Sequence, residues 1–233
     1  MTDTRLDKFI SNQTLLSRND ARKAIFTGRV KVNDETILKI DFKIDTALDS
    51  VTLDGQPITF EKYVYLIMNK PKGILSATTD KKAKTAVDLL PDIYKKRNTF
   101  PAGRLDKDST GMLLLTDDGE FAHKITGPKH HIEKAYIVEV DGEITDEVVE
   151  GFKNGVTLYD GEVCISAVCE RITETTARVI LTEGKYHQIK RMFGVYNLGV
   201  NSLHRERIGT LTLPKELKEG QFCKIEPQLL TEN

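Results

Sequence analysis

The sequence lacks the features of an exported, disulfide-stabilised or membrane-spanning protein. Its three cysteines, Cys164, Cys169 and Cys223, form no CxxC pair and are odd in number, so neither a disulfide framework nor a zinc site is expected. The N-terminus has no basic segment followed by an apolar run, and no stretch approaches the roughly 18 consecutive apolar residues that span a membrane. We therefore expect a soluble cytoplasmic protein with no membrane partner.

Motifs for nucleotide cofactors and metals are missing as well. The chain has no P-loop and no dinucleotide fingerprint, and its histidines do not stand at ligand spacing with carboxylates or cysteines. We expect neither a cofactor nor a metal. With 233 residues, 39% of them hydrophobic, the chain is long enough to bury a sizeable core in one large domain or in two smaller ones.

The chain also has no large excess of positive or negative charge: its formal net charge is −1. Basic residues nevertheless gather in blocks. Lys and Arg outnumber Asp and Glu by seven to two in residues 4–31, by eleven to four in 62–107 and by five to one in 184–207, whereas 32–60 has two against six. One such block is ordinary solvated surface in many proteins, but three of them favour a polyanionic partner.

The beginning of the chain predicts two short helices followed by small strands. Apolar residues at helical spacing begin at Leu6, and Ser17 with Asp20 forms an S-x-x-D capping signal for the second helix. Arg18 and Arg22 stand four residues apart on that helix, so their charges share one face. Such a face suits a phosphate backbone.

The run RLDKFI followed by SRNDARKAIFTGRVKVND resembles the small RNA-binding domain named after ribosomal protein S-four, over residues 1–60. The resemblance implies binding of structured RNA by its shape and backbone. The arginines expected to take part are Arg5, Arg18, Arg22 and Arg29. The alternative is a helical domain with ordinary surface arginines.

Residues 61–233 predict a second domain of mixed composition, after a linker near 56–62. Turn signals separate its elements, and their order is not a regular βαβ alternation. An α+β domain with a mainly antiparallel sheet is therefore expected. Its predicted strands are 64–68, 112–116, 135–140, 163–169 and 176–182, and its predicted helices are 119–126, 145–154 and 186–197.

The run FPAGRLDKDSTGMLLLTDDG is the most informative segment. Its apolar block Met112–Leu115 predicts a buried strand, which would fix one end of the polar loop before it. Asp106 stands between Arg104 and Lys107, whose positive charges favour an ionised carboxylate, and such a group can act as a nucleophile. On these residues alone, a structural turn or helix cap is the better explanation of the loop.

Two further segments carry polar side chains in a pattern. In the run GKYHQIKRMFGVYN, a helix would gather His187, Lys190 and Arg191 on the side opposite its apolar residues. A plain surface helix fits that pattern equally well. The second segment is the run KAYIVEV, which reads as a strand. On such a strand Lys134 and Tyr136 would point to one face and border one pocket, although such pairs are common by chance.

Taken together, four runs resemble those of pseudouridine synthases in the order found there: MNKPKG, GRLDKDSTG, KAY and EGKYHQIKRMF. The S-four-like domain and the runs PKHHIEKAY and KYHQIKRMF resemble, more narrowly, the branch that modifies small-subunit ribosomal RNA. The resemblance implies an enzyme that isomerises one uridine of ribosomal RNA to pseudouridine, with 16S RNA or an assembling small subunit favoured as its substrate. We expect it to act as a monomer. The resemblance also implies a pseudouridine synthase catalytic domain over residues 61–233.

The resemblance assigns roles by position. Asp106 matches the aspartate that attacks the target nucleotide, Tyr136 the tyrosine that stacks on the uracil and helps move the proton from C5, and Lys190 the cation that pairs with the aspartate. Many relatives have arginine at the position of Lys190, so Arg191 stays an alternative partner. Substrate or RNA contacts are implied for Arg104, Leu105, Lys134, His187 and Arg191.

Three other functions stay open at this point. They are a pseudouridine synthase acting on large-subunit RNA, a non-catalytic RNA-binding factor of ribosome assembly, and an RNA hydrolase that uses Asp106 with Asp108. Two routes are also open for Asp106: attack on the uracil ring, or attack or proton removal at the ribose.

Overall fold

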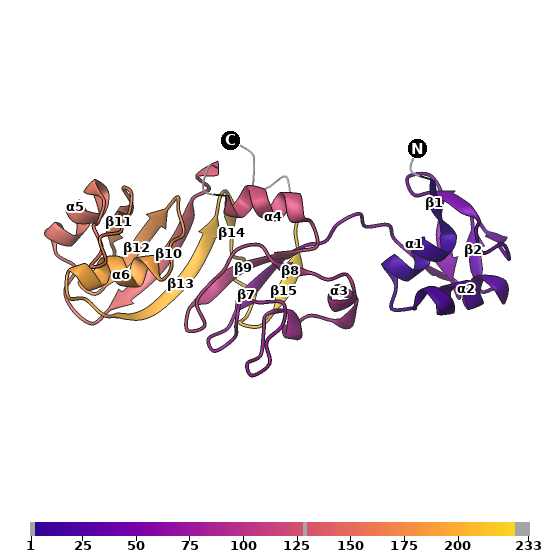
Figure 1. Cartoon of the computed structure of the whole chain (residues 1–233), viewed down its shortest axis with the longest axis horizontal. Helices are drawn as coiled ribbons and strands as arrows, with labels where there is room; N and C mark the ends of the chain where they lie inside the picture. The colour runs from indigo at the N-terminus through magenta and orange to yellow at the C-terminus, as the bar shows by residue number, and fades with distance from the viewer. Residues whose placement is uncertain (1–2, 128–129, 227–233) are drawn as a thin grey trace. The chain divides into compact units, whose positions relative to one another are not determined.

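A computed structural model describes residues 3–127 and 130–226, traced in Figure 1. Pro128 and Lys129, which begin the run PKHHIEKAY, lie outside the described residues. The chain divides into two compact units. Unit 1 contains residues 1–63 and 91–98, and unit 2 contains 64–90 and 99–233.

Unit 1 begins with the two short helices expected from the sequence, α1 (Leu6–Gln13) and α2 (Arg18–Phe26). The Ser17 hydroxyl accepts a hydrogen bond from the N–H of Asp20 at 3.1 Å, so the S-x-x-D signal caps α2 as predicted. A third helix, α3 (Asp92–Lys96), also belongs to this unit. The apolar faces of α1 and α2 form one core with strands β2 (Val30–Val32) and β5 (Val51–Leu53).

Short strands complete unit 1. Asn33 and Asp34 join β2 to β3 and have φ angles of 49° and 67°, which a tight hairpin turn requires. One sheet has the order β3-β2-β5-β6, and β1 pairs with β4 separately. The strands are β1 (Asp3–Arg5), β2 (Val30–Val32), β3 (Glu35–Thr36), β4 (Lys43–Asp45), β5 (Val51–Leu53) and β6 (Gln56–Pro57).

Unit 2 is built on one sheet with the order β11-β12-β10-β13-β9-β7-β15, with β14 beside β13 and β8 beside β9 (Figure 1). Among the described residues of this unit, every strand pair is antiparallel except β9 with β13, which confirms the α+β class with a mainly antiparallel sheet. Its strands are β7 (Tyr65–Lys70), β8 (Phe100–Pro101), β9 (Thr110–Thr116), β10 (Lys134–Val140), β11 (Val168–Arg171), β12 (Thr176–Leu181), β13 (Val200–Ile208), β14 (Leu211–Thr212) and β15 (Phe222–Lys224).

Helices cover this sheet over two separate cores. In Figure 1, α5 (Asp146–Asn154) and α6 (Gln188–Val195) lie near β10 to β12, and α4 (Gly119–Thr126) lies near β8 and β9. The first core includes Phe152 and Phe193, whose rings lie 4.7 Å apart, and the second joins α4 to β7 and β9. A short 3-10 helix, η1 (Val87–Leu89), completes the described elements.

The strand predicted at 163–169 is wrong over most of its length, because only Val168–Arg171 forms a strand there. The preceding residues turn back on themselves instead. Cys164 and Val156 exchange backbone hydrogen bonds of 2.8 and 3.2 Å, and Leu158 donates to the carbonyl of Glu162 at 2.8 Å. The Asp-Gly turn signal at 160–161 therefore closes a hairpin that interrupts the expected strand.

The last glycine of GRLDKDSTG joins the two halves of the sheet. Gly111 pairs with Arg205 where β9 meets β13, and its φ is 100°. A Cβ atom at Gly111 would lie 2.4 Å from the carbonyl oxygen of Arg205. Only glycine permits both this conformation and this approach of the two backbones. The loop that carries Asp106 therefore ends at a fixed point of the sheet.

Candidate active site

Asp106 lies on a short loop between β8 and β9 that hydrogen bonds hold in place. The N–H of Leu105 donates to the Ser76 hydroxyl at 3.0 Å, and that hydroxyl donates to the Leu105 carbonyl at 2.8 Å. The N–H of Ser109 donates to the Asp106 carbonyl at 3.2 Å and closes a turn. The structural turn favoured by the local residues is therefore present, and it gives the Asp106 carboxylate a fixed backbone.

Two side chains from the start of α6 approach Asp106. Lys190 Nζ lies 3.7 Å from one carboxylate oxygen and His187 Nε2 lies 3.5 Å from the other. Lys190 Nζ also lies 2.6 Å from both oxygens of Asp108, and this hydrogen bond lowers the pKa of Asp108 below its usual value. Asp108 is thereby held ionised, which makes it a poor general acid for an RNA hydrolase.

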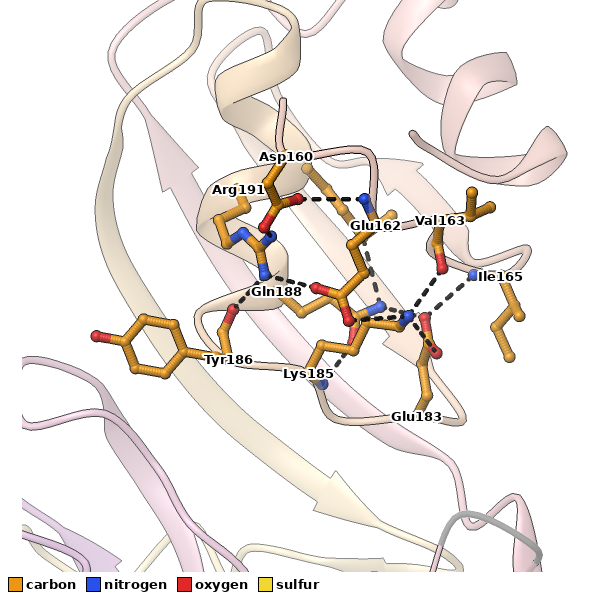
Figure 2. Close-up of polar contacts among 10 residues, drawn as sticks. Asp160, Glu162, Val163, Ile165, Glu183, Lys185, Tyr186, Gln188 and Arg191 are labelled. Carbon is orange, nitrogen blue, oxygen red and sulfur yellow. Dashed lines mark hydrogen bonds and ion pairs between the residues drawn. The ribbon is translucent and has the colours of Figure 1, made fainter. Parts of the chain in front are cut away.

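Arg191 belongs to a different network, drawn in Figure 2. Its guanidinium pairs with Asp160 and with Glu162 at 2.8 Å, and it donates to the carbonyl of Tyr186 at 3.2 Å. The cation beside Asp106 is therefore Lys190, and Arg191 holds the backbone of the segment that leads into α6.

A cavity of about 520 Å³ opens beside Asp106. Its wall comes from the Asp106 loop, β10, residues 181–189 and β13. Lys190 and Arg191 are not among the residues that line this cavity. Six residues singled out from the sequence do line it: Arg104, Leu105, Asp106, Lys134, Tyr136 and His187.

Lys134 and Tyr136 stand on one face of β10 and both line the cavity, as alternation along a strand predicts. The Tyr136 side chain is buried. Lys134 Nζ donates to the carbonyl of Ile132 at 3.0 Å. Burial, together with the nearby charge of Arg205, lowers the pKa of Lys134 from 10.5 to about 8. The cavity therefore contains an amine that loses its proton more readily than a surface lysine does.

Arg205 in β13 lines the same cavity and was not anticipated from the sequence. It is 2% exposed, its Nε donates to the carbonyl of Met112 at 2.8 Å, and its Nη1 donates to the carbonyl of Arg104 at 3.3 Å. Nη1 also lies 3.5 Å from the Tyr136 hydroxyl. Among the described residues, no group accepts a hydrogen bond from Nη2. Arg205 therefore connects β9, the Asp106 loop and Tyr136.

Lys70, in the run MNKPKG at the end of β7, is a second residue whose place in the site the sequence did not reveal. Its side chain is fully buried, and its Nζ donates to the carbonyls of Pro71 at 3.1 Å and Lys107 at 3.4 Å. The Lys107 carbonyl also accepts a hydrogen bond from the N–H of Gly73 at 2.7 Å. The run MNKPKG thus supports the loop from behind.

Four arginines expected to contact RNA lie in unit 1, and three of them converge on one carboxylate. Arg5, Arg18 and Arg22 place Nε 3.1, 3.3 and 3.0 Å from the oxygens of Asp7, whose side chain is fully buried. Burial raises the pKa of Asp7, but the three hydrogen bonds outweigh it and lower the pKa to about 2. Arg29 belongs to a separate, exposed ion pair.

In the ranges 3–127 and 130–226, no group of three or more His, Cys, Asp or Glu side chains is arranged to hold a metal ion. Within the same ranges, no helix is long and apolar enough to cross a lipid bilayer. Cys164 and Cys169 are buried free thiols, and burial raises the pKa of Cys169 to about 11. Neither thiol has the lowered pKa of a reactive cysteine.

Comparison with known proteins connects this site to a class of enzymes. The RNA pseudouridylate synthase family matches residues 64–194, and the S4 domain matches residues 4–47. The chain belongs to the RNA pseudouridylate synthase family and is therefore an enzyme of that class with an N-terminal S4 domain. The matched region contains Asp106, Tyr136 and Lys190.

Individual relatives cover nearly the whole chain. "Ribosomal small subunit pseudouridine synthase A" of Escherichia coli K12 is 40% identical over 94% of this chain and 94% of its own length. An "uncharacterized RNA pseudouridine synthase" of Aquifex aeolicus is 37% identical over 98% and 95%. A solved structure, "Crystal structure of pseudouridylate synthase", superposes with a TM-score of 0.69 at 33% identity and covers 97% of both chains.

Proposed function

We propose that this enzyme converts one uridine of small-subunit (16S) ribosomal RNA to pseudouridine, with Asp106 as its covalent catalyst. One observation carries the proposal: the Asp106 carboxylate, on a hydrogen-bonded loop, lines the cavity and lies within 3.7 Å of Lys190. A carboxylate restrained on a rigid backbone beside a cation has the charge and the orientation that a nucleophile needs.

The reaction conserves every atom of the substrate. The bond between ribose C1′ and uracil N1 breaks, the base rotates, and a new bond joins C1′ to C5. The proton that leaves C5 is balanced by the proton gained at N1, so no external donor is consumed. Asp106 acts either by attack on the uracil ring or at the ribose, and both routes begin from the ionised carboxylate.

The neighbours of Asp106 receive distinct roles in this proposal. Tyr136 stacks on the uracil and carries the proton from C5 through its hydroxyl, which Arg205 approaches to 3.5 Å. Lys190 orients the Asp106 carboxylate and balances its charge. The remaining cavity residues, Arg104, Leu105, Lys134 and His187, contact the substrate.

The target uridine has to leave its stack to reach Asp106, which costs a few kcal/mol. Contacts of basic side chains with phosphates offset this cost and make binding depend on salt. In unit 1 the side chains of Arg5, Arg18, Arg22 and Arg29 serve this purpose, since each stays between 41% and 49% exposed beside its carboxylate partner. We propose that the enzyme acts as a monomer in the cytoplasm, on 16S RNA or an assembling small subunit.

The choice of 16S RNA is supported by the similarity to the E. coli small-subunit enzyme and is tested by mapping. Pseudouridines are mapped in naked 16S and 23S RNA and in assembling subunits after treatment with the purified protein. One new pseudouridine in 16S RNA is the expected result. Modification of 23S RNA alone would show that the enzyme is a large-subunit pseudouridine synthase instead. RNA binding without any modification would make it a non-catalytic assembly factor.

A further inference from the structure

Tyr186 presents an exposed aromatic ring at the wall of the cavity. Its side chain is among the most exposed large hydrophobic groups of the described chain, at 72%, although it lines the cavity beside Asp106. The ring stacks on the imidazole of His187, with centroids 3.9 Å apart and planes 19° from parallel. His187 Nε2 in turn lies 3.5 Å from an Asp106 oxygen. The exposed Tyr186 ring is therefore separated from the Asp106 carboxylate only by the His187 ring.

The backbone under this ring pair is held by polar side chains, of which Gln188 is buried. The buried Gln188 accepts a hydrogen bond from the N–H of Lys185 at 2.9 Å and donates to Glu183 at 2.6 Å. Arg191 donates to the Tyr186 carbonyl at 3.2 Å. Figure 2 shows the Tyr186 ring directed away from this network, which contacts only its main chain. The network fixes the base of the ring pair and leaves its outer face open.

His187 stands in a strained conformation that keeps the pair in place. Its φ is 48° and ψ is 34°, in the left-handed region that residues other than glycine seldom occupy. Strain of this kind persists where the surrounding structure enforces it and gathers at binding and catalytic sites. The Gln188 bonds on one side and the Arg191 bond on the other supply that enforcement. The ring pair is thus preorganised before any ligand arrives.

We infer that the Tyr186–His187 pair is a stacking platform for the RNA base next to the target uridine. The inference rests on the proposed function, because a uridine that leaves its stack for the cavity uncovers the face of its neighbour. A flat π-face at the cavity wall can cover that base again, and aromatic stacking accepts any base because every base has a π-face. The platform adds recognition of a flanking nucleotide to the contacts made with the uracil itself.

The test uses the full-length enzyme and an RNA fragment that spans the mapped uridine, with 2-aminopurine at one flanking position at a time. Stacking on an aromatic ring quenches the fluorescence of 2-aminopurine. We expect quenching at one flanking position with the wild type and with Tyr186→Phe. Tyr186→Leu should abolish this quenching and raise the Kd roughly tenfold. The exposed tyrosine Tyr159, at 80%, does not line the cavity and supplies the matched control Tyr159→Leu.

Two outcomes overturn the platform: equal quenching and Kd in Tyr186→Leu and wild type, or equal losses in Tyr186→Leu and Tyr159→Leu. Pseudouridine formation by the wild type on the same fragment is measured in parallel. If the wild type forms no pseudouridine, the result counts against the proposed function. If the wild type is fully active and Tyr186→Leu has the same quenching and Kd, the result counts against the platform alone.

Discussion

The ammonium nitrogen of Lys70 lies 3.4 Å from the carbonyl oxygen of Lys107, so a fully buried cation contacts the residue that follows Asp106. Burial lowers the pKa of Lys70 from 10.5 to about 8, although the charges of Asp108 and Asp106 act in the opposite direction. A cation kept inside the protein at this cost needs its carbonyl partners. This contact connects the run MNKPKG with the loop that carries Asp106.

Replacement of Lys70 should therefore slow catalysis by displacing the loop. In Lys70→Met both donated hydrogen bonds are lost, and a displacement of about 1 Å at Asp106 would lower the single-turnover rate constant roughly 100-fold. The Kd for RNA should stay near that of the wild type. The exposed Lys72 gives the matched variant Lys72→Met, which should retain the wild-type rate. Equal rates in the two variants would show that Lys70 does not position the loop.

Lys190 and Arg191 offer a comparison of two adjacent cations with different partners. Lys190→Met removes the charge beside Asp106, and we expect the single-turnover rate constant to fall roughly 100-fold, while Lys190→Arg keeps most of the rate. Arg191→Met breaks the pairs with Asp160 and Glu162 instead. It should lower the Tm and change the rate only a few-fold. A larger rate loss in Arg191→Met than in Lys190→Met would reverse our assignment of the partner of Asp106.

Asp7 should make the stability of unit 1 depend on pH in the acid range. Its pKa falls from 3.8 to about 2 in the folded chain, so its stabilising effect is fully present only well above 3.8 and is lost as the pH falls through 3.8 towards 2. This shift corresponds to about 2 kcal/mol. Hydrogen exchange of the α1 and α2 amides in the full chain, measured across this range, should show the loss in the wild type.

Two substitutions compare the stability contributed by this buried cluster with that of an exposed ion pair in the same unit. Asp7→Asn should destabilise unit 1 by about 3 kcal/mol, because three arginines lose their common partner. Asp54→Asn removes the partner of Arg29 in an exposed, solvent-screened pair and should leave the stability of unit 1 nearly unchanged. Similar exchange rates for α1 and α2 in both variants would contradict the role given to Asp7.

Much of the fold follows from local patterns that the sequence displays. The predicted helix at 119–126 has the bounds of α4, where the Asp118 side chain accepts hydrogen bonds from the N–H groups of Glu120 and Phe121. β9 and β10 likewise follow from apolar or alternating runs, although β9 begins two residues earlier than predicted. Capping and alternation depend on neighbouring residues only, so they can be predicted from the local sequence.

β13, the longest strand described, was missed for the opposite reason. Its sequence VNSLHRERI carries charged and polar residues at positions that would be apolar in an ordinary buried strand. Arg205 is buried there because carbonyls of Met112 and Arg104 accept its hydrogen bonds, and those residues lie about a hundred positions earlier in the chain. Lys70 is comparable, since its acceptor on Lys107 becomes visible only once β7 and the loop meet. Long-range partners of buried cations cannot be read from local spacing.

The most direct test of the central claim is the Asp106→Asn variant, assayed for RNA binding and for single-turnover formation of pseudouridine in the same preparation. The change keeps the size of the side chain and removes its charge, so the cavity wall should persist and RNA should bind with a Kd close to that of the wild type. We predict that pseudouridine formation falls below detection, because an amide cannot replace the carboxylate as nucleophile. Pseudouridine formation at an appreciable fraction of the wild-type rate would contradict the assignment of Asp106 as the covalent catalyst.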